Sequence, residues 1–243
     1  MRDSHDILTD APPPAADVRI AYGPEPLEFG DLRVPEGEPP FPLAIVLHGG
    51  YWEAIYNLIH TGHMCRALAA EGIATWNLEY RSVGVPGGEW QGAREDLVLA
   101  LAYLEHVPLD NDRVVLVGHS AGGQLALWAA KHARLPVVAL APVSDVAESI
   151  ARKGPDDGPA RFMTPEHLAE GSPIELLPLG VRQIVIHGTA DESVPYETSR
   201  LYVEAAGAEA ELVTLEETGH FELIDPLAPQ FEETLAAIRR LLG

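Results

Sequence analysis

Apolar runs that alternate with helical patterns are the feature that most constrains the fold of this chain. The runs lie at residues 42–50, 73–80, 113–120, 135–145, 182–189 and 210–220. Their length and mostly apolar composition are typical of strands that are buried on both faces of a parallel sheet. Stretches with helical spacing lie between and after them. Strands that alternate with helices predict an α/β fold, with a mostly parallel central sheet and helices on both of its faces.

Several segments depart from this alternation. Residues 17–23 and 27–35 predict two short strands before the first long run. Residues 1–17 include a proline-rich stretch and predict an exposed N-terminal arm. Residues 146–180 are rich in proline and glycine and carry short helical pieces, which predicts a small cap insertion over one edge of the sheet. We expect a single domain, residues 1–243, because 243 residues with 47% hydrophobic content suit one full core.

The chain is strongly acidic, with 37 Asp and Glu residues against 16 Lys and Arg residues and a formal net charge of −21. Such a surface repels phosphate groups, which argues against nucleic acid, anionic membranes and polyanionic substrates as partners. No segment is apolar for long enough to form a signal peptide or a membrane span, so we expect a cytoplasmic protein. The single cysteine, Cys65, lies in a helical pattern and is expected to be a buried small residue rather than a catalytic thiol.

The sequence GHSAGG, residues 118–123, matches the pattern G-x-S-x-G. It directly follows an apolar run and directly precedes a helical pattern, which is the strand–turn–helix setting of a nucleophile elbow. The turn is tight, so the residues two before and two after the serine must be small, and Gly118 and Gly122 meet that need. Ser120 is therefore the expected nucleophile. A serine that only caps the helix is the alternative.

A serine hydroxyl is a poor nucleophile without a base, and the base needs an acid that orients it. In a chain of this kind the acid and the histidine follow the serine in the order Ser, Asp, His. Asp191 and His220 each stand just past the end of an apolar run, where open α/β sheets place their sites. Asp145 and Glu192 are rival acids. A turn-forming role for Asp191 and a surface-loop position for His220 are the structural alternatives.

The sequence HGGYW, residues 48–52, leaves the first long run through two glycines. Attack by a serine on a carbonyl puts negative charge on the carbonyl oxygen, and backbone N–H groups must meet that oxygen with little steric cover. The residue after the nucleophile, Ala121, is one expected donor. Gly50 and Tyr51 are the others, because Gly50 lets the backbone approach the substrate.

The aromatic residues of this loop, Tyr51 and Trp52, are expected to wall the substrate pocket, with Phe162 and Met163 adding to the walls from the cap. The alternative is that the aromatics only pack in the interior. Flat apolar walls under a short cap suit an aromatic group and a small acyl group. We therefore expect acetyl to butyryl aryl esters to be the best substrates, with activity falling by the octanoyl ester.

The remaining histidines are weaker candidates. His48 is expected to hold the HGG loop by hydrogen bonds, His119 to point away from the site, and His187 to pack in the core. His60 and His63 lie three residues apart, but a metal site would need a third ligand and no acid stands at a helpful spacing. No metal site is expected.

Over about residues 40–243 the chain resembles the α/β-hydrolase superfamily. The motifs HGGYW, LEYRSVG and GHSAGG together resemble the kynurenine formamidase-like branch, which is close to the hormone-sensitive-lipase-type esterases. Those esterases usually carry a third glycine after HGG, where this chain has Tyr51. The resemblance implies an α/β-hydrolase fold and a cofactor-free hydrolase of esters or N-formyl arylamines, with Ser120, Asp191 and His220 as its triad.

The motifs and the resemblance together predict a serine hydrolase that cleaves small carboxylic esters, aryl esters above all, through an acyl-enzyme. An arylformamidase acting on amides of the N-formylkynurenine type is the main alternative. A peptidase of the prolyl-oligopeptidase type is disfavoured, because it normally brings a large gating domain and the N-terminal segment is too short for one. A catalytically silent binding protein is disfavoured because all three triad residues are present. The sequence leaves the natural substrate and the oligomeric state open, a homodimer included.

Overall fold

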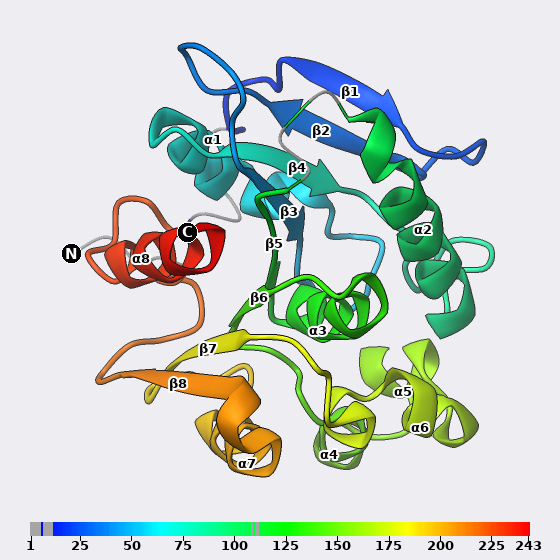
Figure 1. Cartoon of the computed structure of the whole chain (residues 1–243). Helices are drawn as coiled ribbons and strands as arrows, with labels where there is room; N and C mark the ends of the chain where they lie inside the picture. Colours follow the sequence, from blue (N-terminus) through cyan, green and yellow to red (C-terminus); the bar gives the residue numbers. More distant parts are fainter. Residues whose placement is uncertain (1–5, 7–11, 108, 110–111) are drawn as a thin grey trace.

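An eight-stranded sheet runs through the centre of the molecule in the computed structural model, which describes residues 6, 12–107, 109 and 112–243 (Figure 1). The strands are β1 (Val18–Ala21), β2 (Phe29–Arg33), β3 (Leu43–Leu47), β4 (Ala74–Leu78), β5 (Val114–His119), β6 (Val137–Leu140), β7 (Gln183–Gly188) and β8 (Ala210–Leu215). The α-helices are α1 (Gly62–Ala70), α2 (Trp90–Tyr103), α3 (Ala121–Ala133), α4 (Val146–Lys153), α5 (Gly158–Phe162), α6 (Leu168–Gly171), α7 (Tyr196–Ala206) and α8 (Phe231–Leu242). Short 3₁₀ turns are η2 (Leu58–Thr61), η3 (Leu104–His106), η4 (Pro165–His167), η5 (Pro173–Leu176) and η6 (Gly207–Glu209).

The strand order across the sheet is β1-β2-β4-β3-β5-β6-β7-β8. The first two strands are antiparallel to their neighbours, and β4, β3, β5, β6, β7 and β8 are parallel. Each of the six long apolar runs forms one of these parallel strands, which confirms the predicted mostly parallel sheet. Parallel strands end at a common edge, so the loops after β3, β5, β7 and β8 meet there.

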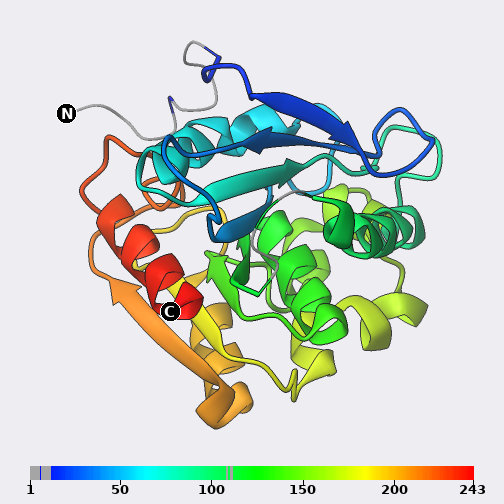
Figure 2. The ribbon, with the colours of Figure 1, turned by 45° about the horizontal axis from the view of Figure 1, so that its top comes forward.

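Helices cover both faces of the sheet, with α1 and α8 on one face and α2, α3 and α7 on the other (Figures 1 and 2). Strand β3 shows how the sequence allows helices to cover both faces. Ala44 and Val46 pack with the residues of α1 and α8, whereas Ile45 and Leu47 pack with those of α2 and α3. Successive side chains of a strand point to opposite faces, so a strand that is covered on both sides must be apolar at every position.

The segment 146–180 is an insertion between β6 and β7, and it packs beside α3 and α2 (Figure 1). Gln124 Nε2 of α3 donates to the carbonyl of Gly171 at 2.8 Å, and Trp128 Nε1 donates to the carbonyl of Glu170 at 3.1 Å. These contacts hold the insertion along the α3 side of the sheet. Its helix α4 also reaches the loops after β3 and β7, because Lys153 Nζ lies 4.7 Å from the ring centroid of Tyr51 and Arg152 Nη2 donates to the carbonyl of Ser193 at 3.1 Å.

The expected N-terminal arm, residues 1–17, is described only in part, because residues 1–5 and 7–11 lie outside the described residues. Its last residues run beside β2. Arg33 Nη2 donates to the carbonyl of Pro14 at 2.9 Å, and the backbone N–H of Val34 donates to Asp17 Oδ2 at 2.7 Å. The end of the arm is therefore tied to the sheet.

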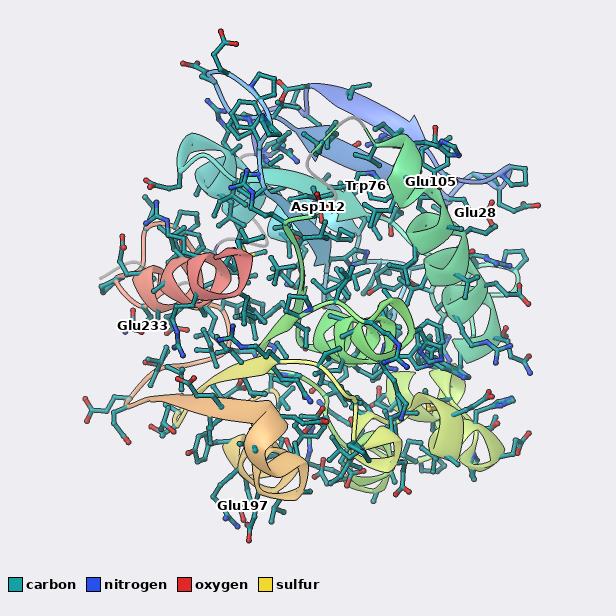
Figure 3. The ribbon with its side chains drawn as sticks, in the orientation of Figure 1. Glu28, Trp76, Glu105, Asp112, Glu197 and Glu233 are labelled. Atoms are coloured by element: carbon teal, nitrogen blue, oxygen red, sulfur yellow. The ribbon has the colours of Figure 1, made fainter. Side chains whose placement is uncertain are left out.

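Many acidic side chains lie on the outside of the molecule, as Glu105, Glu197 and Glu233 do in Figure 3, whereas others such as Glu79 and Asp96 are buried. Trp76 of β4, in contrast, is fully buried and lies 6.3 Å from the ring of Tyr103 on α2. None of the described helices is long and apolar enough to cross a membrane.

A buried ion pair ties the loop after β4 to α2. Asp96 of α2 is fully buried and accepts three hydrogen bonds from Arg81, at 2.7 Å from the backbone N, 2.8 Å from Nε and 2.6 Å from Nη2. Burial raises the pKa of the Asp96 carboxyl, and the hydrogen bonds from Arg81 oppose that rise. The same loop reaches the segment after β3, because the N–H of Val83 donates to the carbonyl of Trp52 at 2.7 Å.

We expect Arg81→Ala to lower the free energy of unfolding by about 3–5 kcal/mol, because it leaves a buried carboxylate without its partner. Urea denaturation followed by circular dichroism measures this change. Arg200→Ala is the matched control, since Arg200 pairs with Glu197 and Glu204 on the exposed face of α7. Equal stability of the two variants would show that the Arg81–Asp96 pair does not hold the loop.

Candidate active site

Ser120 lies at a sharp turn between β5 and α3, with φ +57° and ψ −120°. A non-glycine residue rarely adopts this conformation, so the surrounding packing must enforce it. A Cβ atom on Gly118 would lie 2.1 Å from the carbonyl oxygen of Gly122, and one on Gly122 would lie 2.2 Å from that of Leu47. Both glycines are therefore required. In the described chain the Ser120 side chain makes no capping hydrogen bond to α3, unlike the serine of the alternative interpretation.

Asp191 and His220 form a close pair at the ends of β7 and β8. His220 Nδ1 lies 2.6 Å from Asp191 Oδ2. The other carboxylate oxygen, Oδ1, accepts the backbone N–H groups of Ser193 at 2.8 Å and Val194 at 2.9 Å. The loop after β7 thus fixes the orientation of the carboxylate, and the carboxylate fixes the ring of His220.

His187, which was expected only to pack in the core, is a further partner of Asp191. Its Nε2 lies 3.1 Å from Asp191 Oδ2 and 3.0 Å from the carbonyl of Val194, and its Nδ1 lies 2.7 Å from Ser199 Oγ. Both atoms near Nε2 are acceptors, so Nε2 carries the proton and donates. Burial acts to raise the pKa of Asp191, but the hydrogen bonds from His187 and His220 overcome it and hold that pKa well below its usual range.

His119 contacts His220 from the opposite side, which corrects the expectation that it points away from the site. The two rings lie 4.5 Å apart, and His119 Nε2 donates to the carbonyl of His220 at 2.9 Å. His119 Nδ1 must then accept, and it receives the Nε2 proton of His60 at 3.0 Å. Burial lowers the pKa of both side chains, that of His119 to about 3, so they are neutral and keep these tautomers.

A cavity of about 170 Å³ brings the expected nucleophile and base together. Its lining consists of Gly50, Tyr51, Tyr56, His60, Ser120, Ser193, His220 and Phe221. The side chain of Asp191 is buried and is not among the residues that line this cavity, but it contacts His220, which does line it. Two of the expected oxyanion-hole residues, Gly50 and Tyr51, lie on the cavity wall, and Ala121 is fully buried at the first position of α3.

The HGG loop is held against the elbow by close packing. A Cβ atom on Gly49 would lie 2.9 Å from Ser120 Cβ, so the first glycine of the pair lets the loop touch the serine. His48 holds the loop from below, as expected, because its Nε2 lies 2.9 Å from Glu79 Oε1 and its Nδ1 lies 2.8 Å from the carbonyl of Gly49. The second glycine, Gly50, has φ +113° and turns the chain over the cavity.

The expected pocket walls are only partly correct. Tyr51 lines the cavity, but Trp52, Phe162 and Met163 are at most 1% exposed and belong to the core. The ring of Trp52 stacks on that of Phe162 at 4.6 Å, and Trp52 Nε1 donates to Gln124 Oε1 at 3.0 Å. The loop therefore turns its two aromatics to opposite sides, and the insertion carries Phe162 and Met163 into the interior instead of over the cavity.

The rival catalytic groups lie elsewhere. Asp145 Oδ1 caps α4 by accepting the N–H of Glu148 at 3.0 Å. Glu192 is exposed and lines an adjoining cleft that shares Ser193, His220 and Phe221 with the catalytic cavity. Burial raises the pKa of the Cys65 thiol to about 12, which keeps it protonated. Among the described residues, no three His, Cys, Asp or Glu side chains are grouped in a way that could hold a metal ion.

Two family models match the chain. The model of the prolyl oligopeptidase family matches residues 89–226, and a model described as BD-FAE matches residues 31–137. The first match includes Ser120, Asp191 and His220. The second includes the HGG loop and the elbow.

A curated relative and several solved structures are similar to this chain. Esterase LipC from Mycobacterium tuberculosis (strain ATCC 25618 / H37Rv) is 26% identical over 237 residues. That match covers 84% of this chain and 57% of LipC, so the chain spans a little over half the length of this relative.

The solved structures include esterase B from Lactobacillus rhamnosis (HN001), with a TM-score of 0.80, 20% identity and coverage of 98% of this chain and 89% of the other. A putative thioesterase from Silicibacter sp. has a TM-score of 0.76 and 24% identity, covering 97% and 89%. The propionate-bound esterase Est2 from Thermogutta terrifontis has a TM-score of 0.73 and 20% identity, covering 94% of each chain. At these identities the likeness concerns the fold, and it confirms the expected α/β-hydrolase fold.

Gly50→Ala tests the role of the HGG loop. Its new Cβ atom would lie 2.4 Å from Tyr56 Cβ and would displace the loop. Loss of well-placed N–H donors should lower kcat for p-nitrophenyl butyrate by about 10²-fold or more. Gly154→Ala is the control, because Gly154 has a similar φ of +110° and no atom within 4 Å of the added Cβ. If both variants keep the wild-type kcat, the loop does not serve the reaction.

Asp191→Asn should lower kcat by about 10⁴-fold, because an amide N–H facing Nδ1 favours the wrong tautomer of His220. The ionised carboxylate also stabilises the fold, since its folded pKa lies below the unfolded value. The stability advantage of the wild type over the variant should be complete above about pH 5 and shrink as the pH falls through and below about 4. Steady-state kinetics measure the loss of kcat, and urea denaturation between about pH 3 and 8 measures the stability difference. A mild loss here with a severe loss in Asp145→Asn would identify the other acid.

Proposed function

This chain belongs to the prolyl oligopeptidase family of α/β-hydrolases, and we propose that it is a serine esterase that cleaves small carboxylic esters, aryl esters above all. The observation that carries the proposal is the shared cavity. Ser120 on its strained turn and His220, held by Asp191, open on one space beside the HGG loop. The esterases among the similar proteins support the same activity.

The proposed reaction begins with attack of Ser120 Oγ on the ester carbonyl, while His220 Nε2 accepts the hydroxyl proton. Asp191 stabilises the imidazolium that forms, and the charge on the carbonyl oxygen meets the backbone N–H groups of Gly50, Tyr51 and Ala121. His220 then gives the proton to the departing alcohol, which leaves an acyl group on Ser120. A water molecule, deprotonated by His220, hydrolyses this acyl-enzyme.

The size of the cavity limits the substrate. Its volume of about 170 Å³ lies below the roughly 300–1,000 Å³ of pockets that hold drug-sized ligands. Aromatic side chains of Tyr51, Tyr56 and Phe221 form much of its wall. We therefore expect acetyl to butyryl p-nitrophenyl esters to have the highest kcat/KM, with a decline by the octanoyl ester.

Hydrolysis of N-formylkynurenine is a second candidate activity. It rests on Tyr51, which stands where hormone-sensitive-lipase-type esterases usually have a third glycine, and which lines the cavity beside Ser120. A formyl group is smaller than any acyl group of the ester series and fits the same space. Direct comparison of kcat/KM for N-formylkynurenine and p-nitrophenyl butyrate decides between the two.

Ser120→Ala should abolish labelling by a fluorophosphonate probe and lower kcat for p-nitrophenyl butyrate by several orders of magnitude, because the triad acts as a unit. Circular dichroism checks that the variant is folded. EDTA should leave the wild-type rate unchanged. Near-wild-type turnover in Ser120→Ala would end the proposal, and inhibition by EDTA would point to a metal-dependent reaction instead.

A further inference from the structure

A second and larger cavity lies next to the one at Ser120. Its volume is about 360 Å³, and it is lined by Arg19, Leu27, Phe29, Ala54, Tyr56, Asn57, Leu58, Ile59, Glu79, Tyr80, Ser82 and Val85. It sits over the carboxyl end of β4, at the same edge of the sheet as the catalytic cavity. Among the described residues, Tyr56 alone lines both cavities.

Tyr56 is held in place as a partition between the two spaces. Its backbone N–H donates to the carbonyl of Glu53 at 3.0 Å, which closes the turn after the HGG loop. Its side chain covers Gly50, so closely that an added Cβ on Gly50 would lie 2.4–2.7 Å from Tyr56 Cβ, Cγ and Cδ2. Tyr56 is 37% exposed and lines both cavities, so the part of its side chain that does not cover Gly50 faces these two spaces.

The buried polar groups of the second cavity are already paired with the protein. Glu79 Oε1 lies 2.9 Å from His48 Nε2, and Glu79 Oε2 accepts the N–H of Leu58 at 3.1 Å. Tyr80 donates its hydroxyl proton to the carbonyl of His48 at 2.7 Å. The remaining wall is largely apolar, so this space suits an uncharged hydrocarbon group.

The rim of the second cavity has the same character. Ile55 and Ile59 beside it are 76% and 49% exposed, which places unusual apolar surface at this point of an acidic protein. The cation at the rim, Arg19, is neutralised by Asp31, with Nε 2.7 Å from Oδ1 and Nη2 3.0 Å from Oδ2. The rim therefore offers little net charge to a substrate.

The strand order indicates which half of an ester faces this side. Ser120 follows β5, and the second cavity lies over β4, on one side of it. Asp191 and His220 follow β7 and β8, on the other side. Because His220 must protonate the departing alcohol, the alcohol lies on the β7–β8 side. The acyl group then points toward Tyr56 and β4.

We propose that Tyr56 is a specificity-determining residue that ends the acyl site, and that the cavity over β4 is an acyl extension which Tyr56 closes. This inference rests on the proposed esterase function. In the wild type the acyl group stops at the ring of Tyr56, and this limit produces the short-chain preference that we expect. Without that ring the two spaces join, and the enzyme accepts an unbranched acyl group of medium length.

The test is a chain-length series of p-nitrophenyl esters from acetyl to decanoyl with the wild type and Tyr56→Ala. The ratio of kcat/KM for octanoate to that for butyrate should rise at least about tenfold in Tyr56→Ala, since even one methylene in an apolar pocket has an effect of that size. Tyr56→Phe keeps the ring and should keep the short-chain preference. Ile55→Ala changes the neighbouring exposed side chain, which lines neither cavity, and should also leave the ratio unchanged.

A double variant shows where the longer chain goes. Leu27 lines the second cavity from the loop between β1 and β2 and does not line the first, so Leu27→Trp reduces the space of the second cavity alone. In the Tyr56→Ala background it should reverse the gain on octanoate. A gain that survives Leu27→Trp would mean that the chain extends into solvent, and an unchanged ratio in Tyr56→Ala would mean that Tyr56 does not end the acyl site. Either result overturns the inference about Tyr56 and leaves the esterase proposal intact. The esterase proposal fails only if the wild-type activity does not depend on Ser120.

Discussion

The close approach of three backbone segments at the elbow is the constraint on which the rest of the site depends. Gly49 lies against Ser120, Gly122 lies against the end of β3, and Gly118 lies against Gly122. With a side chain at any of these positions, the two segments in contact there would have to move apart. The HGG loop could then not reach the serine, and the strained φ of Ser120 would lose the packing that enforces it. The absence of side chains at these glycines is therefore what allows the cavity to form, and the hydrogen bonds that orient His220 depend on it.

Buried histidines perform the orientation that follows. His187 donates to Asp191 from one side, and His119 donates to the carbonyl of His220 from the other. His60 supplies the proton that fixes the tautomer of His119. Because burial keeps His60 and His119 neutral, their donor and acceptor positions do not change over the ordinary range of pH. The ring of His220 is therefore held by a carboxylate and by its own backbone.

The sequence was sufficient to predict the parallel strands and the placement of Ser120, Asp191 and His220, because both depend on local patterns. A buried strand can be recognised from a short apolar run, and the elbow can be recognised from a serine that is flanked by glycines. The pocket walls were not predictable in this way. Tyr51 and Trp52 both have a positive φ, and their side chains leave the backbone on opposite sides of the loop. No periodicity in the sequence indicates which of the two faces the cavity. The contacts of two histidines were equally hidden from the sequence. His119 contacts His220, which is distant in the sequence, and His187 contacts Asp191 across the turn after β7.

The insertion between β6 and β7 connects two walls of the cavity. Besides the contacts of the insertion with α3, its helix α4 reaches two residues that line the cavity. Lys153 Nζ lies 4.7 Å from the ring centroid of Tyr51, and Arg152 Nη2 donates to the carbonyl of Ser193 at 3.1 Å. Tyr51 follows β3 and Ser193 follows β7, so two neighbouring cations of one helix join loops that come from different strands. A shift of α4 would therefore move both walls together, which couples the width of the cavity to the position of the insertion.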